Sequence, residues 1–191
     1  YYRAFRKQGM NVDLIDMDCS IEGYQVLVLP MTYMFKQGFA EKVRAFVEQG
    51  GMLITTYWSG IADDTDRCYL GGTPHGLMDV LGLRSTEIDG LFDWEENQLM
   101  PVDGNELGLF REYTCKYLCN LVKLDGAQAL MTYGSDFYQG YPALTVNRYG
   151  KGSAWYVAAD AEQVFQEDFI AKLLEHEEIC GAVPGEIPEG L

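Results

Sequence analysis

Residues 24–57, YQVLVLPMTYMFKQGFAEKVRAFVEQGGMLITTY, decide the predicted fold. Residues 24–30 form a continuous apolar run with β-branched side chains, which is typical of a parallel strand buried on both faces. Residues 36–49 carry apolar side chains at helical spacing and are followed by Gly50 and Gly51, which predicts a helix. Residues 52–57 repeat the buried-strand pattern. Strand, helix and strand with short connections favour an α/β fold, in which helices flank a mostly parallel sheet.

The rest of the chain yields further elements. The pattern predicts a short strand at 11–16, a helix at 77–81, a strand at 84–91, and strands at 127–133, 142–148 and 153–158. The last two flank a tight turn and should form a C-terminal β-hairpin. A helix is expected at 161–177, capped by Asp160. Residues 92–108 fit no element, and 109–124 suit a strand as well as a helix.

The beginning of the chain reads as part of something longer. Residues 1–9 resemble the last turns of a helix ending at Gly9. A doubly wound sheet needs a central strand before its first helix, and no such strand is found here. We therefore expect a piece of a longer chain, with residues 1–179 as one domain that lacks its first strand. Residues 180–191 are rich in Gly, Pro and Glu, which predicts a linker.

Charge and cysteine content limit the partners. The 191 residues include 29 acidic and 14 basic side chains, for a net charge of -15. Residues 1–60 hold six of each, so the excess of acid lies later in the chain. This balance argues against nucleic acid and anionic membranes, which both require basic surfaces. No apolar run is long enough to span a membrane. The five cysteines, an odd number, favour free thiols in a reducing compartment, which predicts a cytoplasmic protein.

The search for a catalytic centre finds only weak candidates. The segment from Thr56 to Gly60 follows a buried strand, where α/β enzymes place an exposed nucleophile. Its central residue is the bulky Trp58, which makes it a degenerate nucleophile elbow. Ser59 with His75 as its base is the alternative that this segment leaves open, as an amidotransferase-like hydrolase. His176 reads as a surface residue at a helix end.

Metal and cofactor motifs are equally weak. Cys115 and Cys119 would share one face if their segment were a helix, but a second pair of zinc ligands is missing. Three aspartates in the loop after residue 62 lack the later residues of a calcium loop. Glu95 and Glu96 are adjacent, so on an extended chain their carboxylates point apart. No phosphate-binding loop is present. We therefore predict no metal, no cofactor and no catalytic residue in this chain.

Aromatic residues in predicted loops are the remaining signal. Such residues often anchor interfaces or provide platforms for sugars. The candidates for either role are Tyr33, Phe35, Trp58, Trp94 and Tyr138. A carbohydrate-binding module that uses these rings is a second alternative.

Several separated motifs, in order, resemble one known family. They are YYRAFRKQGMNVDLID at 1–16, VLVLPMTYM at 26–34, VRAFVEQGGMLITTYWSGIADD at 43–64, GGTPHGLMDVLG at 71–82 and DFYQGYPALTVNRYGKGSAWYVAA from Asp136. Together they resemble the middle domain of glycoside hydrolase family 42 β-galactosidases. Residues 92–125 are the least distinctive part of the match.

The resemblance implies both a fold and a role. The fold would be flavodoxin-like, similar to class I glutamine amidotransferases, and the domain would mediate formation of a homotrimer. The parent enzymes hydrolyse terminal β-D-galactosides with retention. Their catalytic glutamates lie in a barrel domain that precedes the middle domain, so the fragment itself would not be an enzyme. The linker would lead to a small C-terminal β-domain.

Overall fold

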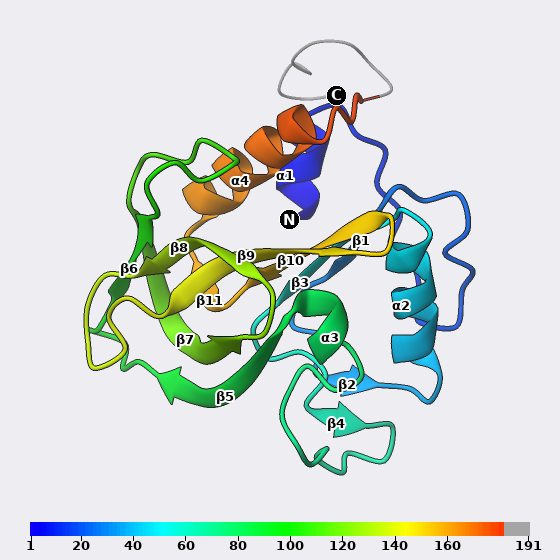
Figure 1. Ribbon diagram of the computed structural model, residues 1–191, viewed down its shortest axis with the longest axis horizontal. Helices are drawn as coiled ribbons and strands as arrows, with labels where there is room; N and C mark the ends of the chain where they lie inside the picture. The colour runs from blue at the N-terminus through cyan, green and yellow to red at the C-terminus, as the bar shows by residue number, and fades with distance from the viewer. Residues whose placement is uncertain (182–191) are drawn as a thin grey trace.

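The computed structural model describes residues 1–181, and its main feature is a mixed sheet of nine strands. Figure 1 shows this sheet crossing the molecule, with four helices beside it. In spatial order the strands are β1 (Val26–Leu29), β3 (Met52–Thr56), β10 (Gly152–Val157), β9 (Pro142–Tyr149), β8 (Gln128–Tyr133), β6 (Asn97–Pro101), β7 (Tyr113–Leu124) and β11 (Ala159–Ala161). The ninth, β5 (Leu83–Gly90), pairs with β7. A separate parallel pair joins β2 (Met34–Phe35) to β4 (Ala62–Asp63).

The expectation of a flavodoxin-like, mostly parallel sheet is wrong. Within the large sheet, only the pairs β1–β3 and β3–β10 are parallel. The remaining pairs of the large sheet are antiparallel. The physical reason lies in residues 83–161, where strands β5 to β11 follow one another with no helix between them. A parallel partner needs a long crossover connection, whereas short turns permit only antiparallel neighbours.

Residues 24–57, on which the predicted fold was based, form the expected strand, helix and strand. Strands β1 and β3 flank helix α2 (Phe39–Glu48) and pair in parallel. The predicted hairpin is confirmed, because β9 and β10 pair antiparallel from Tyr149 and Gly152 onward. Gly150 in its turn has a φ of +59°, and an added Cβ would lie 2.6 Å from the Glu48 Cα. The strand predicted at 11–16 is wrong, since these residues join no ladder.

The helices lie on both faces of the sheet. Helices α1 (Tyr2–Lys7) and α4 (Gln163–His176) lie together on one side, and α2 and α3 (Met78–Leu81) lie on the other (Figure 1). Beneath α4, Phe165 stacks on Phe169 at 5.6 Å, and the Phe169 ring lies 6.1 Å from buried Trp155. The residue before α4 is Glu162, not the predicted cap Asp160, and it makes no side-chain capping bond.

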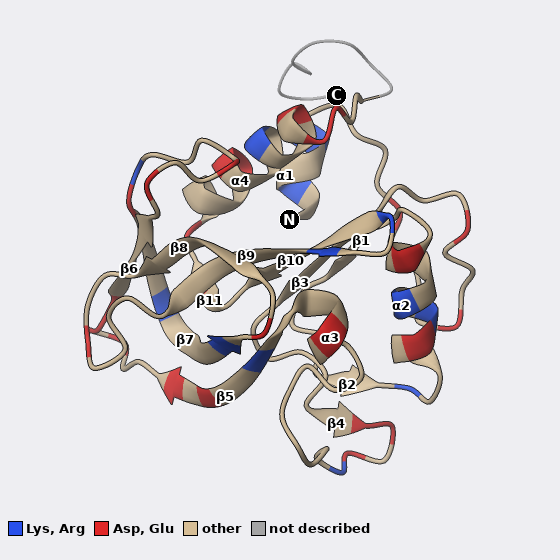
Figure 2. Ribbon diagram, viewed as in Figure 1, with Lys and Arg blue, Asp and Glu red and all other residues tan. Residues whose placement is uncertain are grey.

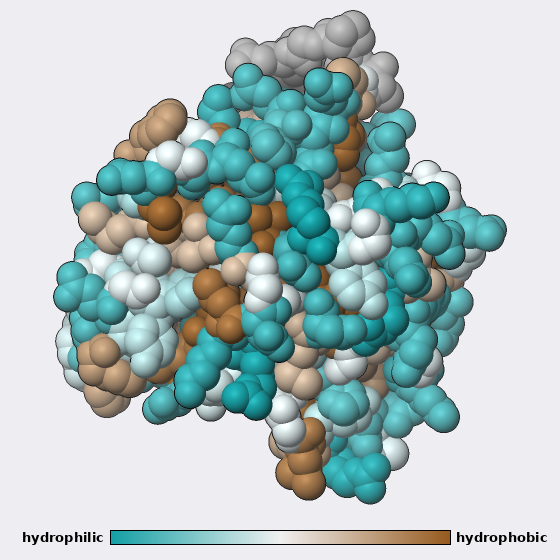
Figure 3. All heavy atoms as spheres, in the orientation of Figure 1, coloured by the Kyte–Doolittle hydropathy of each residue, from teal (hydrophilic) through white to brown (hydrophobic). Residues whose placement is uncertain are grey.

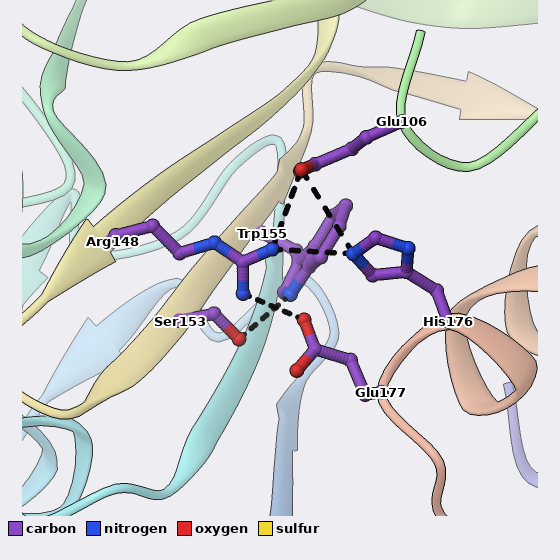
Figure 4. A network of polar contacts seen from close by, with 6 residues as sticks. All are labelled: Glu106, Arg148, Ser153, Trp155, His176 and Glu177. Atoms are coloured by element: carbon purple, nitrogen blue, oxygen red, sulfur yellow. Dashed lines mark hydrogen bonds and ion pairs between the residues drawn. The ribbon is translucent and has the colours of Figure 1, made fainter.

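The end of α4 is fixed to the β9–β10 hairpin by a polar network (Figure 4). The Arg148 guanidinium lies 5.8 Å from the centre of the Trp155 ring and donates to Glu177 at 2.7 Å. Its other arm lies 3.4 Å from Glu106 and 3.3 Å from the His176 ring nitrogen. His176 lies at a helix end, as the sequence suggested, but it belongs to a structural cluster there.

The predicted linker at 180–191 falls almost entirely outside the described residues, and so does the lead into a further β-domain. None of the described helices has the length and apolar character needed to cross a membrane.

Candidate functional site

The turn after β3 has the backbone shape of an elbow. Trp58 adopts a φ of +58°, a left-handed conformation that is uncommon for a bulky residue. The turn is tied to the end of β1, because the Thr56 hydroxyl accepts the Met31 N–H at 2.8 Å and the Ser59 hydroxyl accepts the Thr32 N–H at 3.0 Å. These bonds give Thr56 and Ser59 structural roles at this turn.

Gly60 allows the turn to pack tightly. It also has a positive φ, of +61°, and a Cβ built on it would lie 2.8 Å from the His75 backbone nitrogen. The same Cβ would lie 3.0 Å from the Phe35 ring and 3.1 Å from the Pro74 Cα. No side chain larger than hydrogen fits here without movement of the backbone.

Ser59 and His75 do not form a nucleophile–base pair. The Ser59 side chain is buried, and within residues 1–181 no hydrogen bond joins it to His75. The His75 ring is stacked on Tyr69 with centroids 3.7 Å apart, and its Nδ1 has no partner among the described residues. A working Ser nucleophile needs a base within hydrogen-bond reach. The geometry therefore gives no support to the hydrolase alternative.

The five candidate aromatic residues fall into three environments. Phe35 and Tyr138 are buried in the core, where their rings touch other parts of the same domain. Tyr33 and Trp58 are half-buried and stack with centroids 6.0 Å apart. Trp94 is 79% exposed, so it alone of the five offers most of its ring to a partner.

Trp94 belongs to a larger set of exposed aromatic residues. It stacks on Phe92 at 4.9 Å with the rings nearly parallel, and the Leu91 N–H bonds to the Tyr117 carbonyl, which places their loop beside β7. Tyr117 was missed, because residues 109–124 had no clear assignment and its φ of +59° interrupts the alternation of the strand. Other exposed aromatic residues are Tyr2, Phe110, Phe137 and Tyr141.

The candidate carboxylates each contact a different neighbour and do not form one shared site. Glu95 accepts the Phe92 N–H, whereas Glu96 lies 3.3 Å from the Lys116 ammonium. The Thr65 hydroxyl and nearby backbone N–H groups lower the pKa of Asp63 to about 2. In residues 1–181 no group of three or more His, Cys, Asp or Glu side chains is arranged to hold a metal.

The predicted cysteine pair lies on a strand and not on a helix. Cys115 and Cys119 are both buried in β7, with their sulfurs 4.0 Å apart. The left-handed Tyr117 between them bends the strand and brings the two thiols together. The other three cysteines are exposed, and all five are free thiols.

The surface is mainly polar on the face in view. Figure 2 shows acidic residues on α2, α3 and α4, on several loops and at the end of β5, and few charged residues on the central strands. On the face seen in Figure 3, apolar side chains form small patches separated by hydrophilic ones.

Fold and site together describe a mixed α/β domain in which the described residues assemble no catalytic pair or metal cluster, but present exposed aromatic side chains. Residues 1–180 match the family model described as the β-galactosidase trimerisation domain. The chain belongs to this family, the trimerisation domain of glycoside hydrolase family 42 β-galactosidases.

Similar proteins agree with this assignment. The chain is 43% identical over all its residues to the β-galactosidase BglY of Alicyclobacillus acidocaldarius, of which it covers 28%. It is 41% identical to the β-galactosidase Pbg of Clostridium perfringens, again covering 28%. The crystal structure of a cold-adapted β-galactosidase from Rahnella sp. R3 matches 99% of the chain at 46% identity, with a TM-score of 0.95, and the match covers 28% of that structure's chain. The chain thus spans 28% of the length of these relatives.

Proposed function

We propose that this chain is one domain of a longer retaining β-galactosidase and that it joins three copies of that enzyme, without supplying a catalytic residue. The match of residues 1–180 to the trimerisation family carries the proposal. The relatives of the chain are named β-galactosidases, and their extra length leaves room for a separate catalytic barrel.

The exposed aromatic loop is the surface that best suits self-association. Trp94 and Phe92 are 79% and 63% exposed, and aromatic rings are the residue type most often found as interface anchors. Asp93, Glu95 and Glu96 are their exposed neighbours in the sequence and would give this apolar centre an acidic rim. In a closed trimer each chain uses two different patches, so the aromatic loop of one copy would meet a different surface of the next copy.

Sedimentation velocity of the natural-length protein tests the proposal. Replacing Phe92 and Trp94 together by Ala should weaken the trimer by about 100-fold or more, since anchor residues typically contribute about 2 kcal/mol each. The matched control is Leu70→Ala, at another exposed apolar side chain. A trimer whose stability is unchanged in the double variant would rule out this surface, and a wild-type monomer would rule out the function.

We also propose a cytoplasmic location, which the five free thiols support. The barrel domain of the same chain is then the other partner. For the sugar-binding alternative, the open ring of Trp94 is the single favourable observation. Calorimetry with galactosides separates the two roles, because a pure assembly domain releases no heat of binding.

A further inference from the structure

The two thiols in the middle of β7 have no part in the proposed function. Cys115 and Cys119 are fully buried, and their sulfurs lie 4.0 Å apart, whereas the other three cysteines are exposed. A buried free cysteine on its own packs as a small apolar side chain. Two thiols in contact have a further reaction open to them, because together they can lose two electrons and form a disulfide.

A bulge in β7 brings the two cysteines together. Residues four apart in a regular strand are separated by about 13 Å. Here Cys119 pairs with Ala159 of β11, and the ladder shifts register just after that pair. Cys115 pairs with Ala161, only two residues further along β11. The left-handed Tyr117, with a φ of +59°, takes up the extra length.

This register makes the pair geometrically suited to a disulfide. Two residues of β11 span about 7 Å, so the Cα atoms of Cys115 and Cys119 are separated by roughly that distance. Disulfides join Cα atoms that are up to about 6.8 Å apart. The sulfurs already face each other, so a small shift of the bulge and of the two side chains is enough to close the bond.

The surroundings make Cys119 the more reactive of the two sulfurs. Contact with the Cys115 thiol lowers the pKa of Cys119 by more than burial raises it, and the Tyr138 hydroxyl lowers it further. The same contact, together with burial, raises the pKa of Cys115. The Tyr138 hydroxyl is itself buried and has no hydrogen-bond partner among residues 1–181. Cys119 is therefore the thiolate of the pair, and Cys115 keeps its proton.

We propose that Cys115 and Cys119 form an oxidation site that reacts with hydrogen peroxide and closes to a disulfide. The Cys119 thiolate attacks one peroxide oxygen, the O–O bond breaks, and the departing hydroxide takes up a proton to become water. The Cys115 sulfur then attacks the sulfenic sulfur on Cys119. The S–S bond forms, the S–O bond breaks, and hydroxide leaves with the Cys115 proton as a second water. Two thiols lose two electrons, and one peroxide is reduced to two waters.

Burial selects the oxidant at this site. A bulky disulfide such as oxidised glutathione cannot reach either sulfur in the folded chain, because both cysteines are fully buried. Hydrogen peroxide is small and uncharged, and it reaches buried sulfur during local openings of the structure. The exposed cysteines are open to both reagents.

Peptide mapping of the natural-length protein tests the oxidation site. The folded protein is treated with hydrogen peroxide, quenched with catalase, unfolded in iodoacetamide and digested with trypsin. Cleavage after Arg111, Lys116 and Lys123 places the two cysteines in separate peptides, 112–116 and 117–123. Peroxide should remove both alkylated peptides and produce the two peptides joined by a disulfide, and dithiothreitol should restore them. The readout does not depend on the oligomeric state, so it is independent of the proposed function.

Two matched variants test the order of the reaction. Cys115→Ser retains a hydroxyl that can donate to Cys119 but cannot form the disulfide. Cys119 should then remain as a sulfenic acid after peroxide treatment, and dimedone should label it. Cys119→Ser should leave Cys115 unlabelled, because that thiol keeps its proton. Circular dichroism checks that both variants are folded, and the mapping of the wild-type protein needs neither of them.

Three outcomes would overturn the proposal. The first is that peptides 112–116 and 117–123 stay alkylated after peroxide treatment while the exposed Cys68 is oxidised. The second is that oxidised glutathione joins the two peptides as readily as peroxide does, since burial would then select no oxidant. The third is that dimedone labels Cys115 and not Cys119 in the two variants, since the attacking sulfur would then be the wrong one.

Discussion

Replacing Gly60 by Ala should destabilise the domain by more than the backbone conformation explains. A left-handed φ costs a residue with a Cβ about 1–2 kcal/mol relative to Gly. The new Cβ would also lie 2.8 Å from the His75 nitrogen and 3.1 Å from the Pro74 Cα, both backbone atoms that cannot turn aside. Overpacking of this kind costs a further 1–3 kcal/mol, roughly. We expect a total loss of about 2–5 kcal/mol.

The matched control is Gly104→Ala. Gly104 has a similar φ, of +70°, and an added Cβ would meet nothing within 4 Å. It should therefore lose only the conformational part, about 1–2 kcal/mol. The entropy that Ala removes from the unfolded chain is common to both variants and cancels.

Urea unfolding of the 191-residue chain, followed by far-UV circular dichroism and by tryptophan fluorescence, measures the difference. With an m-value of about 2 kcal/mol/M, the Gly60 variant should unfold at a urea concentration lower by about 0.5–1.5 M than the Gly104 variant. Coincident transitions from the two probes would justify a two-state treatment. Equal losses in the two variants would refute the close approach at Gly60.

Three further results are expected. The Thr65 hydroxyl bond to Asp63 helps hold the pKa of that carboxyl at about 2. The contribution of the carboxylate to stability is therefore present above its unfolded pKa, about 4, and is lost as the pH falls towards 2. The difference in unfolding free energy between wild type and Asp63→Asn should close over this range, and a constant difference would contradict the prediction. Ser59→Ala should cost about 1–2 kcal/mol in urea unfolding, since it leaves the Thr32 N–H without its acceptor, and no loss would contradict the bond. An aromatic disulfide reagent should modify three thiols in the folded chain, with Cys115 and Cys119 reacting only after unfolding.

The part of the fold that could be predicted is the part specified locally. An apolar run, an amphipathic helix and a glycine stop were enough to place β1, α2 and β3, and the glycine turn was enough for the β9–β10 hairpin. The order of strands in the sheet depends on which distant edges meet. Local periodicity does not contain that information. It could therefore not predict that β10 lies beside β3, or that β7 pairs with β5, β6 and β11.

Site residues were harder to predict because aromatic side chains serve cores and surfaces alike. Tyr138 lies in a turn, two residues before Gly140, yet its ring packs edge-on against Tyr133 in the core. Trp94 lies in an equally polar stretch and is open to solvent. The local sequence does not separate the two cases, because burial depends on the distant segments that the fold brings against each ring.

The wrong prediction at residues 11–16 shows what local periodicity leaves out. Strand propensity expresses how well a segment fits between neighbours, so a segment with strand character and no neighbour stays irregular. Residues 11–15 have the alternation of a strand, but among the described residues their backbone groups have no hydrogen-bond partner. A strand pattern alone therefore does not make a strand, because the ladder hydrogen bonds must come from a neighbouring segment.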